Sequence, residues 1–502
     1  MEPETKLSQL KTLLNEVFDL YNVIGLLKWD QQVNQPPGGT HNRSHQLSTL
    51  YRLYHSRYTS DEIGQLLEDL GLYAAQLEPD SDDARLIKVT TRRYKKLTRL
   101  PADLVAEIAQ VVGEAHLAWE QARPAADFAR FRPYLERIVE LRRRQAELFG
   151  PNDHIYDSLL DEYEPGLKTA DVQAIFSALR TQQVALIQAI KERPQVDDHF
   201  LHQHYDEKSQ WDFGVEVISR FGYDWNCGRQ DKSSHPFTET IGPGDVRITT
   251  RFLKDYAASA LFSTMHECGH ALYEQGIDPG LSRSPLGSGA SLAVHESQSR
   301  LYENLVGRSH DFWLHYYPRL QAYFSTQLGN VDLETFYRGI NKVEPSLIRV
   351  EADEATYNLH IMLRLELEIA LIEGSIAVKD LPEAWNSRMQ EYLGLTPPND
   401  GQGVLQDIHW SSGDIGYFST YALGNLISAQ LWECVNQDIP DLPDQIRRGE
   451  FTGLTSWMKE KVHRHGAKFE PQELVQRITG SKIDPAPYLR YLNAKYGEIY
   501  GL

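Results

Sequence analysis

Apolar residues recur at spacings of three and four along most of this chain, which is the period of an amphipathic helix. In residues 4–28 the pattern runs through Leu10, Leu13, Leu14, Val17, Phe18 and Tyr21. The same period predicts further helices at 84–97, 103–123, 131–149 and 170–191. One segment, 245–252, alternates β-branched and polar residues as a strand does. We therefore predict a mainly α fold with a small β element near the middle.

The composition is that of a globular protein, and the net charge excludes some classes of binding partner. Of its 502 residues, 41% are hydrophobic and 24% are charged, which is enough to bury a substantial core. Asp and Glu outnumber Lys and Arg by 70 to 51, a net charge of −19 that argues against nucleic acids and anionic membranes as partners. No apolar run approaches the roughly 18 residues of a membrane helix.

Cysteine usage and the first residues suggest a compartment. The cysteines, Cys227, Cys268 and Cys434, are too few for a disulfide framework, which suits a reducing environment. The first residues lack the basic and apolar regions of a signal peptide. We expect a cytoplasmic protein.

The most informative motif is H-E-x-x-H at His266, Glu267 and His270. Leu261, Met265, Cys268 and Leu272 keep helical spacing around it, so both imidazoles lie on one helix face and can bind one cation. Glu267 can then hold a water whose pKa a zinc ion lowers to about 7. A chance match is expected in roughly one such chain in twenty, and two surface histidines are the alternative. The apolar surroundings favour a buried metal site.

A catalytic metal site needs a third protein ligand, and Glu296 is the best candidate. It lies in a predicted helix that ends near Gly307, and Arg300, one turn later, could orient its carboxylate. His295 competes, because adjacent helix positions point about 100° apart and only one of the two can serve easily. An ordinary helical Glu–Arg pair is the other interpretation.

Peptide hydrolysis would require further groups. A carboxypeptidase needs a cation for the substrate carboxylate, and Arg349 is a candidate in a segment predicted to open a helix that runs to about Gly374. Its position in a first turn would require a partner such as Asp353, or a ligand carboxylate. Other candidates are the neutral donors His409, Tyr417 and Tyr421, and a strand edge after His235 that could hold an extended peptide.

Seven ordered motifs together resemble the carboxypeptidase Taq family of metallocarboxypeptidases, over essentially the whole chain. They are Trp29-Asp30 with Pro37-Gly38-Gly39, His235-Pro236-Phe237, Asp245-Val246-Arg247-Ile248-Thr249, His266-Glu267-Cys268-Gly269-His270, His295-Glu296-Ser297-Gln298, Ile348-Arg349-Val350-Glu351-Ala352-Asp353, and Gly403-Val404-Leu405-Gln406-Asp407-Ile408-His409-Trp410.

The resemblance implies one catalytic domain over residues 1–502: a helical, two-lobed body with a deep groove and the metal at its floor. It also implies a homodimer that releases single C-terminal residues from peptides with broad specificity, but poorly where proline is C-terminal. Zinc is the expected metal, and cobalt can support activity in some members.

Residue roles follow from the same resemblance. It implies that His266, His270 and Glu296 bind the metal, that Glu267 is the general base, that Arg349 anchors the substrate carboxylate near Gln406 and His409, and that His235, Asp245 and Arg247 shape the groove. The chain has Ser419 where the family commonly has proline. Whether Tyr417 or Tyr421 supports the oxyanion stays open.

The leading hypothesis is therefore a zinc-dependent carboxypeptidase. One alternative is a zinc oligopeptidase that cuts internal bonds, which needs no carboxylate anchor. The other is a catalytically silent helical binding protein, which the complete ligand set and Glu267 argue against.

Overall fold

The computed structural model describes residues 2–150 and 153–502, and within them the chain divides into two compact units. Unit 1 comprises Met1–Thr98, Asp198–Ile340 and Leu431–Gly480, and unit 2 comprises Arg99–Asp197, Asn341–Gln430 and Ser481–Leu502. Each unit is thus assembled from three separate stretches of sequence.

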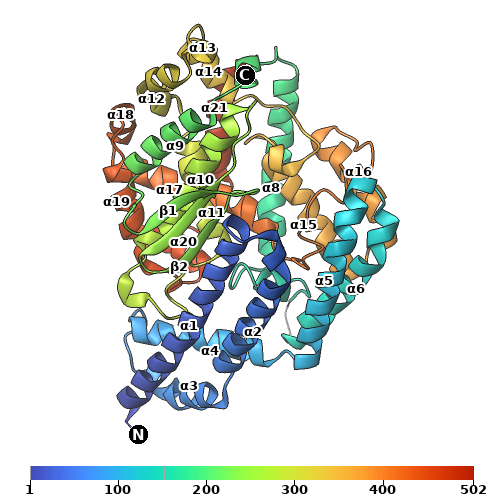
Figure 1. The fold of residues 1–502 in the computed structure, drawn as a ribbon, viewed down its shortest axis with the longest axis vertical. Coiled ribbons are helices and arrows are strands. Elements are labelled where there is room, and N and C mark those ends of the chain that lie inside the picture. The colour runs from blue at the N-terminus through green and yellow to red at the C-terminus, as the bar shows by residue number, and fades with distance from the viewer. Residues whose placement is uncertain (1, 151–152) are drawn as a thin grey trace. The chain divides into compact units, whose positions relative to one another are not determined.

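Unit 1 is mainly helical and contains a small sheet (Figure 1). Its helices are α1 (Pro3–Val33), α2 (Thr40–Tyr58), α3 (Asp61–Ala74), α4 (Asp82–Thr98), α9 (Glu207–Phe221), α10 (Ala257–Gly276), α11 (Leu292–Arg300), a π-helix (Leu301–Val306), α12 (His310–Tyr323), α13 (Ser325–Leu328), α14 (Leu333–Ile340), α18 (Leu442–Arg447), α19 (Thr452–Lys461) and α20 (Pro471–Thr479).

The sheet has the strand order β1-β3-β2, with β1 (Gly228–Lys232), β2 (Thr238–Gly242) and β3 (Asp245–Thr250). The central strand β3 is parallel to β1 and antiparallel to β2, with Thr238 opposite Ile248. Helix α10 packs against β2 and β3. The sheet therefore supports the helix that carries the H-E-x-x-H motif.

Unit 2 contains α5 (Ala102–Ala125), α6 (Phe128–Leu148), α7 (Asp157–Leu160), α8 (Thr169–Lys191), a 3₁₀ turn (Arg349–Glu351), α15 (Tyr357–Glu373), α16 (Leu381–Leu393) and α21 (Ala486–Tyr500). Helix α17 (Ser419–Asp438) begins in the sequence of unit 2 and ends in that of unit 1. Helix α15 is almost wholly buried.

The last stretch of each unit is tied to residues far earlier in the chain. In unit 1, the His463 imidazole Nε2 lies 2.9 Å from Gln298 Oε1 on α11. In unit 2, buried Lys495 on α21 donates to Glu354 at 2.7 Å, just after the 3₁₀ turn. Both contacts join segments that are more than a hundred residues apart in sequence.

The mainly α fold is confirmed, as are the predicted helices at 4–28, 84–97, 103–123, 131–149 and 170–191, which are α1, α4, α5, α6 and α8. The predicted strand at 245–252 is confirmed as β3, although it ends at Thr250. The pattern of apolar and polar residues did not predict strands β1 and β2. Both flank β3, and neither has the alternation of buried and exposed residues that a half-buried strand shows.

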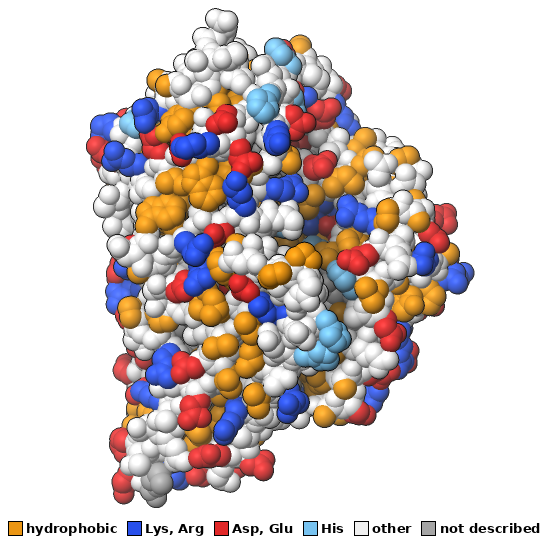
Figure 2. All heavy atoms as spheres, viewed as in Figure 1, with side chains coloured by type: hydrophobic (Ala, Val, Ile, Leu, Met, Phe, Trp, Pro, Cys, Tyr) orange, Lys and Arg blue, Asp and Glu red, His pale blue; other side chains and the backbone are white. Residues whose placement is uncertain are grey.

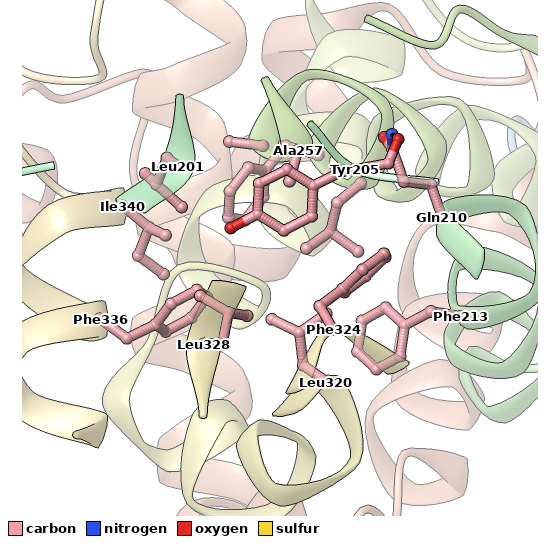
Figure 3. Close-up of a pocket in the computed structure, with 13 residues that line it drawn as sticks. Leu201, Tyr205, Gln210, Phe213, Ala257, Leu320, Phe324, Leu328, Phe336 and Ile340 are labelled. Atoms are coloured by element: carbon pink, nitrogen blue, oxygen red, sulfur yellow. Dashed lines mark hydrogen bonds between the residues drawn. The ribbon is translucent and has the colours of Figure 1, made fainter. Parts of the chain in front are cut away.

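An apolar pocket in unit 1 lies at the first turn of α10 (Figure 3). Ala257 and Ala258 line it together with side chains that include Phe213, Phe324 and Phe336. Gln210 also lines the pocket, and its amide donates to the backbone oxygens of Tyr205 and Leu253. Apolar packing thus fixes the start of the helix that presents His266 and His270.

The surface gives no sign of a concentrated acidic or basic region on the face shown in Figure 2, where Lys and Arg side chains alternate with Asp and Glu. Among the described residues, we find no helix that combines the length and the apolar character needed to cross a membrane.

Glu368 on α15 is a fully buried carboxyl group that organises unit 2. It accepts hydrogen bonds from the Tyr156 hydroxyl (2.6 Å), the Trp410 indole (2.8 Å) and the Gly416 backbone (2.9 Å). Burial raises the pKa of Glu368 from 4.5 to about 7, against the lowering effect of these three donors. The folded chain therefore holds a proton there over a pH range in which the unfolded chain has lost it.

We predict that loss of this proton makes unit 2 less stable as pH rises. A raised carboxyl pKa stabilises the fold fully below pH 4.5, and the contribution, about 3 kcal/mol, is lost as pH rises through about 7. Glu368→Gln should lower stability, but the deficit relative to the native protein should shrink between pH 5 and pH 8. Thermal unfolding midpoints across this range measure it, with the exposed Glu383→Gln as the matched control. A constant deficit would contradict the prediction.

Candidate metal centre and arginine cluster

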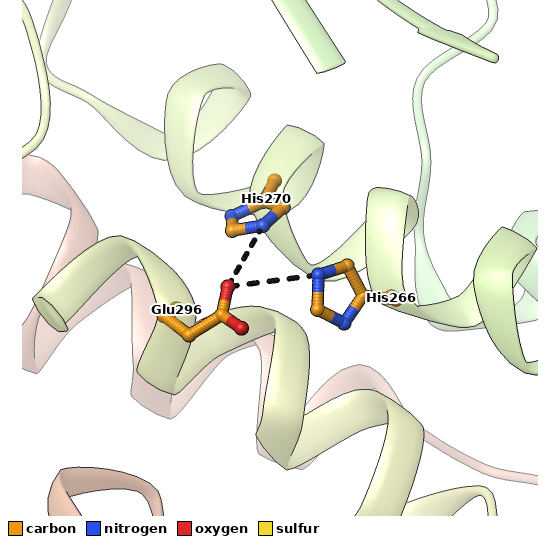
Figure 4. A group of neighbouring side chains, drawn as sticks. All are labelled: His266, His270 and Glu296. Atoms are coloured by element: carbon orange, nitrogen blue, oxygen red, sulfur yellow. Dashed lines mark ion pairs between the residues drawn. The ribbon is translucent and has the colours of Figure 1, made fainter. Parts of the chain in front are cut away.

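His266, His270 and Glu296 converge on one point in unit 1 (Figure 4). Helix α10 carries the two histidines one turn apart, and α11 carries the glutamate. Glu296 Oε2 lies 3.6 Å from His266 Nε2 and 3.4 Å from His270 Nε2. Ligands bound tetrahedrally to zinc at 2.0–2.1 Å are about 3.3 Å apart, so the three groups fit a divalent metal ion.

The close approach of α10 and α11 depends on Gly269, inside the motif. A Cβ atom at this position would lie 2.5 Å from the backbone oxygen of Gln298 and 2.6 Å from Ser299 Cα. Any larger residue would push α11 away from α10. Glycine at position 269 is therefore what allows Glu296 to reach the two imidazoles.

The Glu296 carboxylate is held with one oxygen toward the imidazoles. Arg300, one turn along, donates from Nε to Oε1 at 2.9 Å, which leaves Oε2 facing His266 and His270. Burial raises the pKa of Glu296, but Arg300 and the two histidines outweigh this and hold it well below its usual value. The group is an anion suited to bind a cation.

His266 is backed by a second carboxylate. Its Nδ1 lies 2.8 Å from Glu303 Oε2, in the π-helix that follows α11. Burial lowers the pKa of His266, but Glu296 and Glu303 outweigh it and raise the pKa, so the same field favours a metal cation. The single helix predicted here is wrong in one respect, because its winding changes at Leu301; such π segments are frequent at functional sites.

His270 has a different environment. Burial lowers its pKa to about 4, so the ring is neutral, as a metal ligand must be. Its Nδ1 lies 2.9 Å from His295 Nδ1. His295 thus contacts the back of His270, and it is Glu296 that lies beside both Nε2 atoms.

Glu267 lies beside the three groups in a nearly closed environment, with 6% of its surface exposed. The hydroxyl of Thr238, on β2, donates to Glu267 Oε2 at 2.7 Å and fixes the side chain. Burial raises the pKa of Glu267, and His266 and the Thr238 hydrogen bond offset this only in part. A fixed carboxylate with a raised pKa is suited to take and return a proton.

Arg349, in unit 2, differs from its sequence-based description in two ways. It lies in a 3₁₀ turn rather than at the start of the long helix, which begins at Tyr357 and ends before Gly374. Asp353 is not its partner, because that carboxylate accepts the backbone N–H groups of Ala355 and Thr356 and caps the chain there. Its partner is Asp407, which Arg349 reaches with Nε at 3.0 Å and Nη2 at 2.8 Å.

Asp407 lies between two buried arginines, Arg349 and Arg364. Arg364, on α15, donates from Nε to the second carboxylate oxygen at 2.7 Å. Although burial raises the pKa of Asp407, the two cations hold it far below its usual value, so the cluster carries two positive charges and one negative. This excess positive charge in a dry environment attracts an anion.

Arg349 has more N–H groups than the hydrogen bonds to Asp407 and Tyr357 use. Asp407 and the Tyr357 hydroxyl take three of its N–H groups, on Nε, Nη2 and Nη1, while a guanidinium has five. As far as the described residues go, one N–H on each Nη is left for a ligand. Such a pair matches the two oxygens of a carboxylate.

The other residues of unit 2 that were predicted to bind substrate lie around Arg349 and Asp407. Gln406 Oε1 accepts from the Arg349 backbone at 2.9 Å, and His409 Nε2 lies 3.3 Å from the Tyr421 hydroxyl. The Tyr417 ring centroid is 5.2 Å from that of His409. Sequence analysis named these residues but missed the roles of Asp407 and Arg364. An arginine between Leu363 and Leu365 in a leucine-rich helix was the available signal for Arg364.

His235, Asp245 and Arg247 lie in unit 1, and no direct contact joins them to the three ligand residues in the described part of the chain. His235 is exposed, and its Nδ1 lies 2.8 Å from the Pro236 oxygen. Asp245 accepts two hydrogen bonds of 2.7 Å from Arg247, whose guanidinium lies 4.3 Å from the Trp29 ring centroid.

Comparison with known proteins gives consistent matches over the full length. The family model described as carboxypeptidase Taq (M32) metallopeptidase matches residues 9–496. Thermostable carboxypeptidase 1 of Thermus thermophilus is 42% identical and carboxypeptidase 1 of Bacillus subtilis 36% identical, each over 100% of both chains. The crystal structure of the M32 carboxypeptidase from Deinococcus radiodurans R1 superposes with a TM-score of 0.96, at 41% identity, covering 99% of this chain and 100% of that one.

Proposed function

The chain belongs to the carboxypeptidase Taq (M32) family of metallopeptidases, and we propose that it is a zinc-dependent carboxypeptidase that releases single C-terminal amino acids from peptides with broad specificity. The observation that carries the proposal is the convergence of His266, His270 and Glu296 beside the fixed carboxylate of Glu267. The buried, positively charged cluster at Arg349 supports the preference for a free C-terminus.

Zinc is the metal we propose, with cobalt as a substitute. Two imidazole nitrogens and one carboxylate oxygen are ligands that zinc prefers, and three protein ligands leave the fourth position open, as catalytic zinc sites do. When bound, the metal supplies a Lewis acid that polarises the scissile carbonyl and acidifies a water.

Glu267 is the group we propose for moving the proton. Its carboxylate takes a proton from the attacking water and returns it to the leaving amine. The Thr238 hydroxyl keeps one oxygen engaged at 2.7 Å, so the other is directed to the reaction. The raised pKa of Glu267 makes both transfers easier near neutral pH.

Arg349 is the group we propose for recognition of the substrate's terminal carboxylate, through its two remaining N–H groups. Asp407 and Gln406 hold the guanidinium and its backbone in place. His409, Tyr417 and Tyr421 are the neutral donors nearby, and Tyr417 or Tyr421 would stabilise the oxyanion. His235, Asp245 and Arg247 would contact the rest of the peptide.

The resemblance to the family also leads us to propose a homodimer. The thiols Cys227, Cys268 and Cys434 are all free, which supports a reducing compartment, and we propose the cytoplasm.

Hydrolysis of an N-blocked dipeptide with a free C-terminus, beside its C-terminal amide, tests the proposed function. We expect release of the last amino acid from the free acid only, because the amide lacks the charge that Arg349 would bind. Chelation should abolish the reaction and zinc should restore it.

Other outcomes would redirect the assignment. Cleavage of both substrates would favour an oligopeptidase that needs no carboxylate anchor. Cleavage of neither by the metal-loaded protein would contradict broad specificity and return a binding protein to consideration.

A further inference from the structure

A chain of hydrogen bonds runs from His270 away from the metal position. His270 Nδ1 lies 2.9 Å from His295 Nδ1, and His295 Nε2 lies 2.6 Å from Glu274 Oε1. His270 and Glu274 are one turn apart on α10, and His295, in the first turn of α11, bridges them. The chain therefore joins a candidate ligand to a carboxylate through a bridging imidazole.

The bridging imidazole occupies a built position. A Cβ atom on Gly289 would lie 2.5 Å from His295 Cδ2, so only glycine leaves room for the ring. The Tyr273 ring packs 4.9 Å from it, centroid to centroid, while the Tyr273 hydroxyl accepts the Ala290 backbone N–H. The side chains of His295 and Glu274 are 21% and 7% exposed. This packing holds His295 between its two partners.

The order of donors and acceptors in the chain follows from the carboxylate end. An ionised carboxylate only accepts, so the ring proton of His295 lies on Nε2 and points at Glu274. His295 Nδ1 is then an acceptor, and the proton of His270 must lie on Nδ1. This leaves the lone pair of His270 on Nε2, the atom that lies 3.4 Å from Glu296 Oε2.

The two candidate histidine ligands thus differ in their support. His266 contacts the Glu303 carboxylate directly, whereas His270 is joined to Glu274 through a second imidazole. The order of donors and acceptors along a chain of two imidazoles can reverse, because either nitrogen of each ring can carry the proton. Reversal would place a proton on His270 Nε2 and block metal binding there.

We infer that Glu274 and His295 are positioning residues that fix the tautomer of His270 and so prepare its Nε2 for the metal. This inference rests on the proposed metallopeptidase function. Their effect is exerted through His270, which His295 contacts and to which His295 joins Glu274.

Glu274→Gln is the sharpest test, because the amide keeps the size of the side chain but can both donate and accept. Both tautomers of His295 then become possible. We expect the zinc dissociation constant of the full-length protein, measured by competition with a chromogenic chelator, to rise about 10–100-fold. The visible spectrum of the cobalt-loaded protein should change as well, and neither readout depends on turnover.

Two further variants test whether a change in zinc affinity comes from the loss of any carboxylate or from misfolding rather than from the tautomer of His270. Glu216→Gln makes the same chemical change at a glutamate that pairs with Arg319 in unit 1, and zinc affinity should stay native. His295→Phe keeps a ring in the position but removes the acceptor, so it should weaken zinc binding at least as much as Glu274→Gln. Thermal unfolding of the metal-free proteins shows whether any variant fails to fold.

The outcomes separate this inference from the proposed function. Native zinc affinity in a folded Glu274→Gln or His295→Phe protein overturns the positioning role and leaves the metallopeptidase assignment intact. Absence of zinc binding by the native protein overturns both. A weakened affinity in both variants, with Glu216→Gln unaffected, supports the inference.

Discussion

Replacing Glu267 with glutamine should lower kcat by about 10²–10⁴-fold while the protein keeps its metal. Glutamine preserves the volume of the side chain but has no basic oxygen that can accept a proton from water. The three candidate ligands are untouched, so the zinc content should stay native. Because the substrate still binds, KM should change far less than kcat. Steady-state kinetics on the N-blocked dipeptide, beside metal analysis of the same preparation, measure both.

A shortened acid gives the matched control. Glu267→Asp keeps a carboxylate but withdraws it by one methylene from Thr238 and from the water, so it should retain more activity than the glutamine variant. Near-native turnover by metal-loaded Glu267→Gln would refute the proton-transfer role and require another base.

Replacing Arg349 with methionine should lower kcat/KM for free-acid substrates by about 10²–10³-fold, mainly through KM. A bidentate, charge-assisted contact in a buried site provides several kcal/mol. Methionine keeps much of the apolar volume, and Asp407 keeps Arg364 as a partner, so the cluster should survive. The preference for the free acid over the amide should disappear. The zinc content should not change.

Arg247→Met is the informative comparison, because Arg247 is the other arginine that the sequence nominates as a substrate-binding residue. It is already paired with Asp245 and packed over Trp29, so we expect the free-acid preference to persist in that variant. If Arg247→Met loses the preference and Arg349→Met keeps it, the carboxylate anchor is Arg247.

Sequence reasoning worked best where the relevant physics is local. Helix periodicity identified long elements such as α8, and the i, i+4 spacing placed His266 and His270 on one face of α10. The third group was harder, since His295 and Glu296 are adjacent and only tertiary packing decides which of them faces the pair. Gly269, which permits that packing, was visible in the sequence, but its partner helix was not.

Sequence reasoning failed where residues far apart in the chain determine the local structure or the hydrogen-bond partner. The partner of Arg349 is 58 residues away, and the nearer Asp353 was expected because helix-dipole arguments see only the local chain. Strands β1 and β2 are polar segments beside β3 and carry no alternating signal. The change to π winding at Leu301 has no periodic signature over so few residues.

The interleaving of the two units bears on how the protein is made. A ribosome delivers His266, His270 and Glu296 well before the stretch that places His463 against Gln298, and Arg349 long before Lys495 reaches Glu354. Neither unit can complete its packing until these late segments have been made, so partly built chains expose apolar helix faces. Until then, the helix that carries Glu296 and the segment that follows Arg349 each lack a contact that the finished chain provides.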